Sequence, residues 1–266
     1  MRLDKYLSDN SLVKSRTHAR ELIEAGFVLV DGREIKKPSH DVSEEAKVEI
    51  TGDICPYVSR GGLKLERAIE SFCVDVAGKT ALDIGASTGG FTDVLLQNGA
   101  VKVFAVDSGH GQLADKLKSD RRVVSLEGFN ARNLRQSDLE AAVDIAVCDV
   151  SFISQTLIHG AAYDCLKDGG IFIGLVKPQF ECTRDALSKG GIVKEVKYRF
   201  YASERVYDSL KNIGFSVTGF EISPISGGDG NTEYLICAYK GKAKNPIDNE
   251  YIRGVVFEKH SDNAAK

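Results

Sequence analysis

The chain has 266 residues, of which 42% are hydrophobic and 27% charged, and its formal net charge is −3. This composition is typical of a globular protein of one or two domains and excludes collagen, global disorder and a short disulfide scaffold. No window approaches the roughly 18 apolar residues of a membrane span, the first residues lack an apolar signal segment, and the net charge gives no hint of nucleic acid.

Residues 1–55 are predicted to form a small α+β unit in the order helix, helix, sheet. A short first helix is followed by a second, capped by Ser15 or Thr17, that ends near residue 25. The sheet is expected to contain strands at residues 27–30 and 48–50, with a hairpin turn at Asp31-Gly32.

Beyond a linker at residues 56–62, strands alternate with helices such as 91–97 and 198–212. This order predicts an α/β fold with a doubly wound, mostly parallel sheet over residues 63–240, which binds ligands at the carboxyl ends of its strands. Residues 241–266 are expected to be a mobile tail or a loosely docked short helix. The strands are expected at residues 80–84, 102–106, 123–126, 145–148, 171–176, 215–221 and 233–239.

A glycine-rich loop follows the first strand of that sheet and opens a helix. It is not the dinucleotide fingerprint, because Asp83 would repel a pyrophosphate but could pair with a cationic amino group. Asp107, which ends the next strand, can bind a ribose diol. The pattern suits S-adenosylmethionine, with a plain strand–helix turn as the alternative. The candidate cofactor-binding residues are Asp83, Gly85, Ala86, Ser87, Thr88, Gly89, Gly90, Phe91, Asp107 and Asp149.

The residues after Asp149 argue against two common kinds of methyl acceptor. The chain reads Asp149-Val150-Ser151-Phe152, without the prolines that amino-group methyltransferases often carry at this place. A Pro-Cys pair, which commonly supplies the nucleophile for methylation of base carbon 5, is absent too. A planar nitrogen or a base carbon is therefore a less favoured target than a hydroxyl.

Charged residues are predicted to converge at the strand ends. Lys177 ends an apolar strand, where an ammonium is costly unless paired and partial burial favours the neutral form that accepts protons. Asp149, Glu233 and Lys64 could orient it. Such a group suits deprotonation of a hydroxyl as it attacks a methyl group, and structural salt bridges at strand ends are the alternative.

The two halves together resemble the TlyA family, also described as hemolysin A. The segments Arg2–Leu7, Ser15–Ala19 and Gly26–Gly32 look like the S4 RNA-binding pattern. Similarity to FtsJ-like ribose 2′-O-methyltransferases is carried by Ser59–Leu65, Asp83–Asp93, Asp149–Ser154, Val176–Glu181 and Gly230–Tyr234.

The resemblance implies a catalytic tetrad of Lys64, Asp149, Lys177 and Glu233, S-adenosylmethionine as cofactor, and a cytidine ribose in ribosomal RNA as target. Some members of the family methylate RNA of both subunits and others only that of the large subunit. The linker aromatic, often Trp in the family, is Tyr57 here.

Basic residues gather in the first 37 residues, which contain eight Lys or Arg against six acidic residues. Such side chains could grip phosphates, which position RNA without reading its sequence, and solvated surface charge is the alternative. A second patch is possible at Lys189, Lys194, Lys197 and Arg199. The candidate RNA-binding residues are Arg2, Lys5, Lys14, Arg16, Arg20, Tyr57, Arg60 and Arg67.

The sequence therefore predicts a ribosomal RNA (cytidine-2′-O)-methyltransferase that uses S-adenosylmethionine. Its six cysteines show no metal-ligand spacing, so we expect buried thiols, a reducing cytoplasm and no metal. The partner is expected to be ribosomal RNA or a ribosomal subunit, without a membrane, and a monomer is favoured. The rival interpretations are a non-catalytic RNA-binding or ribosome-assembly protein and, least favoured, a membrane-active hemolysin.

Overall fold

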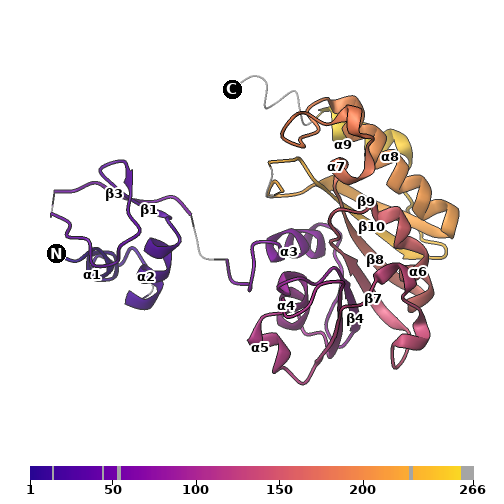
Figure 1. The fold of residues 1–266 in the computed structure, drawn as a ribbon, viewed down its shortest axis with the longest axis horizontal. Helices are drawn as coiled ribbons and strands as arrows, with labels where there is room; N and C mark the ends of the chain where they lie inside the picture. Colours follow the sequence, from indigo (N-terminus) through magenta and orange to yellow (C-terminus); the bar gives the residue numbers. More distant parts are fainter. Residues whose placement is uncertain (14, 44, 53–54, 228–229, 259–266) are drawn as a thin grey trace. The chain divides into compact units, whose positions relative to one another are not determined.

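The computed structural model describes residues 1–13, 15–43, 45–52, 55–227 and 230–258 (Figure 1). The chain divides into two compact units, residues 1–56 and residues 57–266. Most of the predicted linker therefore belongs to the second unit, in which Val58 N donates a hydrogen bond of 2.9 Å to Asp93 Oδ2.

The first unit packs two helices against a small antiparallel sheet. In its described part the strand order is β2-β1-β3, and the pairing of Val30 with Arg33 confirms the predicted hairpin. Ser15 is the helix cap, because its hydroxyl accepts a hydrogen bond from His18 N. The elements are α1 (Leu3–Asp9), α2 (Arg16–Glu24), β1 (Val28–Val30), β2 (Arg33–Glu34) and β3 (Val48–Ile50).

Within the described residues of the second unit, seven strands form a sheet in the order β6-β5-β4-β7-β8-β10-β9. The first five are parallel, and β10 is antiparallel to both of its neighbours. The strands are β4 (Thr80–Ile84), β5 (Lys102–Asp107), β6 (Val123–Glu127), β7 (Val143–Cys148), β8 (Leu166–Val176), β9 (Phe215–Ile222) and β10 (Tyr234–Lys240). Each lies where the sequence predicts one, so the doubly wound prediction is confirmed.

Helices cover both faces of this sheet. Alternate residues of a strand point to opposite faces, so each strand packs against the helices on both sides. Leu82 and Ile84 pack on the face covered by α6, α8 and α9, whereas Ala81 packs on the face covered by α3 and α4. The helices are α3 (Gly62–Ser71), α4 (Gly90–Gln97), α5 (Asp115–Lys118), α6 (His159–Cys165), α7 (Pro178–Glu181), α8 (Val196–Ile213) and α9 (Asn249–Glu258), with short 3-10 turns at Ala131–Asn133, Gln136–Asp138, Gln155–Leu157 and Arg184–Ala186.

Residues 249–258 form a short helix, which is one of the two alternatives expected for the tail, but this helix is packed into the core and not loosely docked. They form α9, whose Ile252 and Val256 are fully buried in the core against α8 and β9. The spacing of four between these two residues gives α9 an apolar face, a signal that the sequence analysis passed over. The remaining tail, residues 259–266, lies outside the described residues.

All six cysteines are described, and none of them is in a disulfide bond. Among the helices that the structure describes, none is long and apolar enough to cross a membrane. Over the same residues, no cluster of three metal-ligating side chains occurs.

Candidate active site

The carboxyl ends of β4, β7 and β8 meet at one edge of the sheet, where β10 begins. The strand pairing sets Ile84 beside Cys148, Cys148 beside Gly174, and Val176 beside Tyr234. The residues that follow or precede these ends are therefore neighbours, although they are far apart in the sequence. This edge is the place where ligands of doubly wound sheets bind.

Lys177 is the central side chain of this edge and is held by two partners. Its Nζ lies 2.5 Å from Asp149 Oδ1 and donates a hydrogen bond of 2.8 Å to Ser151 Oγ. The Lys177 side chain is 10% exposed and that of Asp149 21%. The ammonium also lies 5.9 Å from the ring centre of Phe180. These contacts therefore fix the position of the Lys177 amine at the edge of the sheet.

A second ion pair lies at the same edge. Lys64 Nζ, from the first turn of α3, donates a hydrogen bond of 2.6 Å to Glu233 Oε2 just before β10. Both side chains are buried, so each charge depends on the other for compensation. The pairing of Tyr234 with Val176 sets Glu233 beside Lys177. The structure thus brings the four predicted catalytic residues to one edge as two ion pairs.

Two adjoining cavities open at this edge and share Gly85, Ser87, Asp149 and Ser151 in their walls. The larger, of about 570 Å³, extends along Asp107 to Phe129 and Asn130. The smaller, of about 180 Å³, is bounded by Thr88, Gly90, Phe91, Ser59 and Lys177. Together they form an elongated site with Lys177 at one end.

The glycine-rich loop after β4 forms one wall of the cavities. Its backbone lies very close to the backbone at the end of β7. Gly85 has φ +87°, and a Cβ there would lie 2.4 Å from the Asp149 carbonyl oxygen. Asp107 fixes the opposite side, where its carboxylate accepts hydrogen bonds from Ser87 N (2.8 Å) and Gly109 N (2.7 Å). Gly89, with φ +95°, packs against Leu117 and Leu113.

Asp83 lies beneath this loop and lines neither cavity. Its Oδ2 accepts a hydrogen bond of 2.7 Å from Thr92 Oγ1, while its Oδ1 has no hydrogen-bond partner within the described residues. Burial raises the pKa of Asp83 to about 7. The structure therefore places this carboxyl behind the cofactor loop instead of on its surface.

The raised pKa of Asp83 predicts a pH-dependent stability. The carboxyl of the unfolded chain ionises near pH 4, whereas the folded protein keeps its proton up to about pH 7. The free energy of unfolding therefore falls as the pH rises from about 4 to 7, by on the order of 2 kcal/mol between pH 5 and pH 8. Asp83→Asn keeps an acceptor for Thr92 and is expected to remove that part of the slope. Urea unfolding of both forms at pH 5 and pH 8 measures it, and equal slopes would contradict the assignment.

Two aromatic residues at the site were missed by the sequence analysis. Phe152 has a φ of +64°, which is rare for a bulky side chain, and it is 88% exposed. Its ring centre lies 5.4 Å from that of Phe180, and it lines the larger cavity. Their apolar character predicts core positions, and no local sequence signal marks the left-handed backbone that turns Phe152 outward.

The basic residues of the first unit are partly engaged with a buried acid. Asp4 is 1% exposed and forms ion pairs with Arg2 (3.0 Å) and Arg16 (3.1 Å). The hydrogen bond from Arg2 lowers the pKa of Asp4 to about 2. Both arginines stay about half exposed, and Lys5 and Arg20 are exposed as well. Lys14 lies outside the described residues.

Of the three predicted RNA-binding residues after the first unit, Tyr57 and Arg67 contact acidic side chains and Arg60 is exposed. Tyr57 packs its ring over Gly62 and donates a hydrogen bond of 2.6 Å to Glu66 Oε1, so part of the ring is covered by α3. Arg60 is exposed, and Arg67 pairs with Glu221 at 3.1 Å.

The second basic patch is split by its contacts. Arg199 Nε donates a hydrogen bond of 2.9 Å to the Val193 carbonyl and so supports the backbone of the loop. Lys197 forms an ion pair of 2.7 Å with Glu195. Lys189 and Lys194 are exposed. These last two remain the lysines of the patch best placed to reach a phosphate.

Comparisons with known proteins agree with this architecture. Residues 57–240 match the FtsJ-like methyltransferase model and residues 1–48 the S4 domain model. The chain is 42% identical to "Hemolysin A" of Brachyspira hyodysenteriae, covering 88% of this chain and 98% of the relative. It is 41% identical to the "16S/23S rRNA (cytidine-2'-O)-methyltransferase TlyA" of Mycobacterium tuberculosis, covering 88% of each chain.

A solved structure from Streptococcus thermophilus, described as a candidate hemolysin, has 40% identity and a TM-score of 0.78, and covers 100% of this chain and 98% of its own. The agreement of sequence and fold thus extends over both units. The chain belongs to the FtsJ-like methyltransferase family and carries an S4 domain at its N-terminus.

Proposed function

We propose that the protein transfers a methyl group from S-adenosylmethionine to the 2′-hydroxyl of a cytidine in ribosomal RNA. The observation that carries this proposal is that Lys177 lines the smaller cavity and that Asp149 and Ser151 hold its amine in place. The curated Mycobacterium tuberculosis relative, whose name states this reaction, supports it.

The residues around the cavities fit the proposed cofactor. Its nucleoside end matches the larger cavity, where the Asp107 carboxylate can accept from ribose hydroxyls beside Phe129. Its amino acid end matches the smaller cavity at the glycine-rich loop, which is lined by Ala86, Thr88 and Gly90. When bound, S-adenosylmethionine supplies an electrophilic methyl group on sulfur.

In the proposed step the neutral amine of Lys177 takes the proton of the ribose 2′-hydroxyl as the hydroxyl oxygen bonds to the methyl carbon. The bond between that carbon and the sulfur breaks at the same time, so S-adenosylhomocysteine would leave as the neutral thioether. Asp149 Oδ1 and Ser151 Oγ, which lie 2.5 and 2.8 Å from Lys177 Nζ, fix the position of the amine. The Lys64–Glu233 pair braces the neighbouring strand end. Proton acceptance by one positioned group typically contributes about 10²–10⁴ in rate.

The geometry does not favour methylation of a base carbon through a cysteine. Cys148 immediately precedes Asp149, but its thiol is 1% exposed within the core. Burial raises the pKa of the Cys148 thiol, so the nucleophilic thiolate is disfavoured. A hydroxyl acceptor therefore remains the best match to the groups at this edge.

Phe152 is proposed to hold the target base outside its RNA stack. A reacting ribose must be accessible, and aromatic rings bind displaced bases by stacking at about 1–3 kcal/mol per base. Phe152→Ala is expected to lower kcat/KM for RNA on the order of tenfold, without changing the affinity for S-adenosylmethionine. Exposed Leu157→Ala serves as the control. Steady-state kinetics decide, and an unchanged kcat/KM for Phe152→Ala would remove this role.

We further propose that the S4 unit docks the enzyme on structured RNA, using Arg16, Arg20 and Lys5 against phosphates. Six cysteines without a disulfide bond suit a reducing cytoplasm, where ribosomal RNA is made. The test is transfer of a radiolabelled methyl group to ribosomal subunits from cells that lack this protein. Incorporation into RNA supports the proposal. RNA binding without incorporation would favour an assembly factor, and leakage of liposomes would favour a hemolysin.

A further inference from the structure

A buried carboxylate that the proposed reaction does not use lies behind the active site. Glu181 ends α7, four residues after Lys177, and is 2% exposed. Burial raises the pKa of this carboxyl, against hydrogen bonds that favour the ionised form. A buried acid needs partners to be tolerated, and the identity of those partners indicates what it does.

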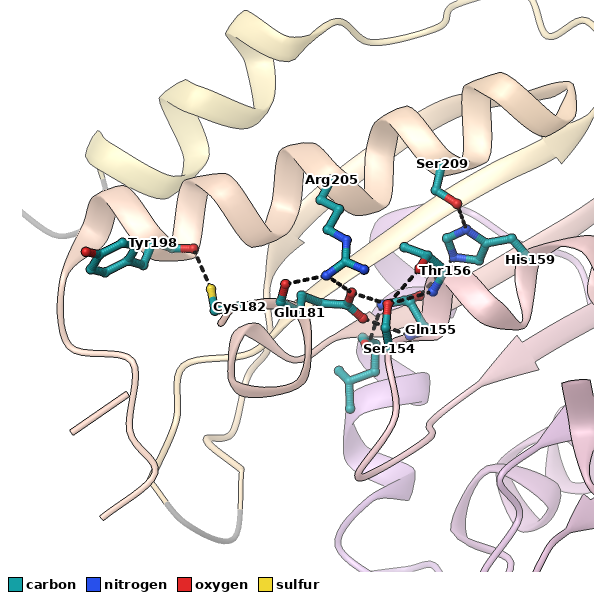
Figure 2. Close-up of polar contacts among 10 residues, drawn as sticks. Ser154, Gln155, Thr156, His159, Glu181, Cys182, Tyr198, Arg205 and Ser209 are labelled. Carbon is teal, nitrogen blue, oxygen red and sulfur yellow. Dashed lines mark hydrogen bonds and ion pairs between the residues drawn. The ribbon is translucent and has the colours of Figure 1, made fainter. Parts of the chain in front are cut away.

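The partners of Glu181 belong to the loop that follows β7 (Figure 2). Its Oε2 accepts a hydrogen bond of 2.5 Å from Ser154 Oγ, and its Oε1 accepts one of 2.8 Å from Gln155 N. On the other side, Arg205 Nη1 donates a hydrogen bond of 2.6 Å to the Glu181 carbonyl and lies 3.9 Å from Oε2. Glu181 thus joins α7 to the loop through its carboxylate and to α8 mainly through its backbone carbonyl.

The far side of the same loop is fixed by neutral groups. Gln155 Nε2 donates a hydrogen bond of 3.1 Å to the Leu175 carbonyl of β8. His159 Nδ1 lies 2.8 Å from Ser209 Oγ of α8, and its Nε2 lies 3.5 Å from Gln155 Oε1 (Figure 2). Burial lowers the pKa of His159 to about 3, so its ring is neutral near pH 7. Glu181 is therefore the acidic side chain that contacts Ser154 and Gln155.

Residues 149–155 and residues 177–181 are held together by polar contacts at both ends, which are called the front and rear cross-links below. In front, Lys177 contacts Asp149 and Ser151. Behind, Glu181 contacts Ser154 and Gln155. Between these cross-links lies Phe152 with its left-handed backbone. A residue in that conformation persists only where its surroundings over-determine it, and the rear cross-link supplies that restraint.

We propose that Glu181 is a positioning residue, whose carboxylate clips residues 149–155 to α7 so that Lys177 Nζ stays aimed at the reacting hydroxyl. This inference rests on the proposed function. The clip acts through geometry and not through charge, because Glu181 contacts neither cavity described above. A misplacement of the order of 1 Å at the reacting atoms can cost about 10²-fold in rate.

Two substitutions separate geometry from charge. Glu181→Ala removes both acceptors and is expected to lower kcat at least tenfold, with the KM for S-adenosylmethionine within twofold of wild type. Glu181→Gln keeps an acceptor for Gln155 N, and its amide can donate to Ser154 Oγ once the serine hydroxyl turns to donate to Thr156 Oγ1, which lies 2.7 Å away. We expect Glu181→Gln to restore kcat to within about threefold of wild type.

The controls address stability and coupling. Val256→Ala removes buried volume from α9, away from the site, so it should lower thermal stability without lowering kcat. Ser154→Ala should slow transfer when made alone but add less than twofold to Glu181→Ala, because both changes break one contact. A kcat for Glu181→Ala equal to wild type, or a Glu181→Gln variant as slow as Glu181→Ala, would overturn the inference.

Hydrogen exchange keeps this test separate from that of the proposed function. Amides of residues 150–157 should exchange at least tenfold faster in Glu181→Ala than in wild type or Glu181→Gln. If wild type transfers no methyl group, the proposed function fails while the exchange rates still decide whether the clip exists. Unchanged exchange in Glu181→Ala would refute the clip in either case.

Discussion

Lys177→Ala is expected to abolish measurable methyl transfer while binding of S-adenosylmethionine stays within a few-fold of wild type. The reason is that the variant keeps the glycine-rich loop and Asp107 but loses the amine that accepts the proton. Loss of one positioned base costs about 10²–10⁴ in rate. Single-turnover transfer to ribosomal subunits and calorimetric titration with the cofactor measure the two quantities separately.

A lysine on the same strand provides the control. Lys167 lies near the opposite end of β8, is 50% exposed and pairs with Asp144 at 2.7 Å. Lys167→Ala should leave transfer unchanged, because a surface ion pair contributes little. If Lys177→Ala retained a tenth or more of wild-type activity, its assignment as the base would be wrong.

Gly85→Ala is expected to weaken binding of S-adenosylmethionine at least a hundredfold and so to remove activity by a different route. An alanine at φ +87° is strained, and its Cβ would lie 2.4 Å from the Asp149 carbonyl oxygen. Backbone has to move to relieve that contact, which displaces both the cofactor loop and the strand end that carries Asp149. Calorimetric titration gives the affinity, and circular dichroism shows that the variant is folded.

The matched substitution is Gly160→Ala in the first turn of α6. A Cβ at Gly160 meets nothing within 4 Å. Alanine is a better helix former than glycine by about 0.8–1.0 kcal/mol, so this variant should bind the cofactor normally and be at least as stable as wild type. Equal cofactor affinity in the two glycine variants would contradict the close approach of the loop to β7.

Much of the fold could be predicted because strand and helix periodicity are local properties. Apolar runs bounded by turn residues mark β4 to β10, and the ends of those strands place Asp149 and Lys177. The strand ends and the resemblance to a known family both placed Lys64 and Glu233 at this edge, but neither predicted that these residues, 169 positions apart, form an ion pair with each other. Long-range partners of this kind depend on the sheet order, which periodicity does not specify.

Other features depend on packing that no short motif reveals. The Glu181 clip needs the loop after β7 to lie against α7, and the turn at Phe152 needs a left-handed backbone in an aromatic residue. Asp83 reads as a cofactor ligand in sequence, yet burial places it beneath the loop. Arg2 and Arg16 read as free phosphate ligands, yet the buried Asp4 pairs with both.

The most direct test of the proposed function is the alkaline digestion of ribosomal RNA that wild-type protein has labelled from radioactive S-adenosylmethionine. A 2′-O-methyl group removes the nucleophile that cleaves the adjacent phosphodiester, so the label should remain in alkali-stable dinucleotides whose first nucleoside is cytidine. Lys177→Ala protein should give no such product. Label recovered instead in mononucleotides with a methylated base, or no label in RNA at all, would contradict ribose methylation.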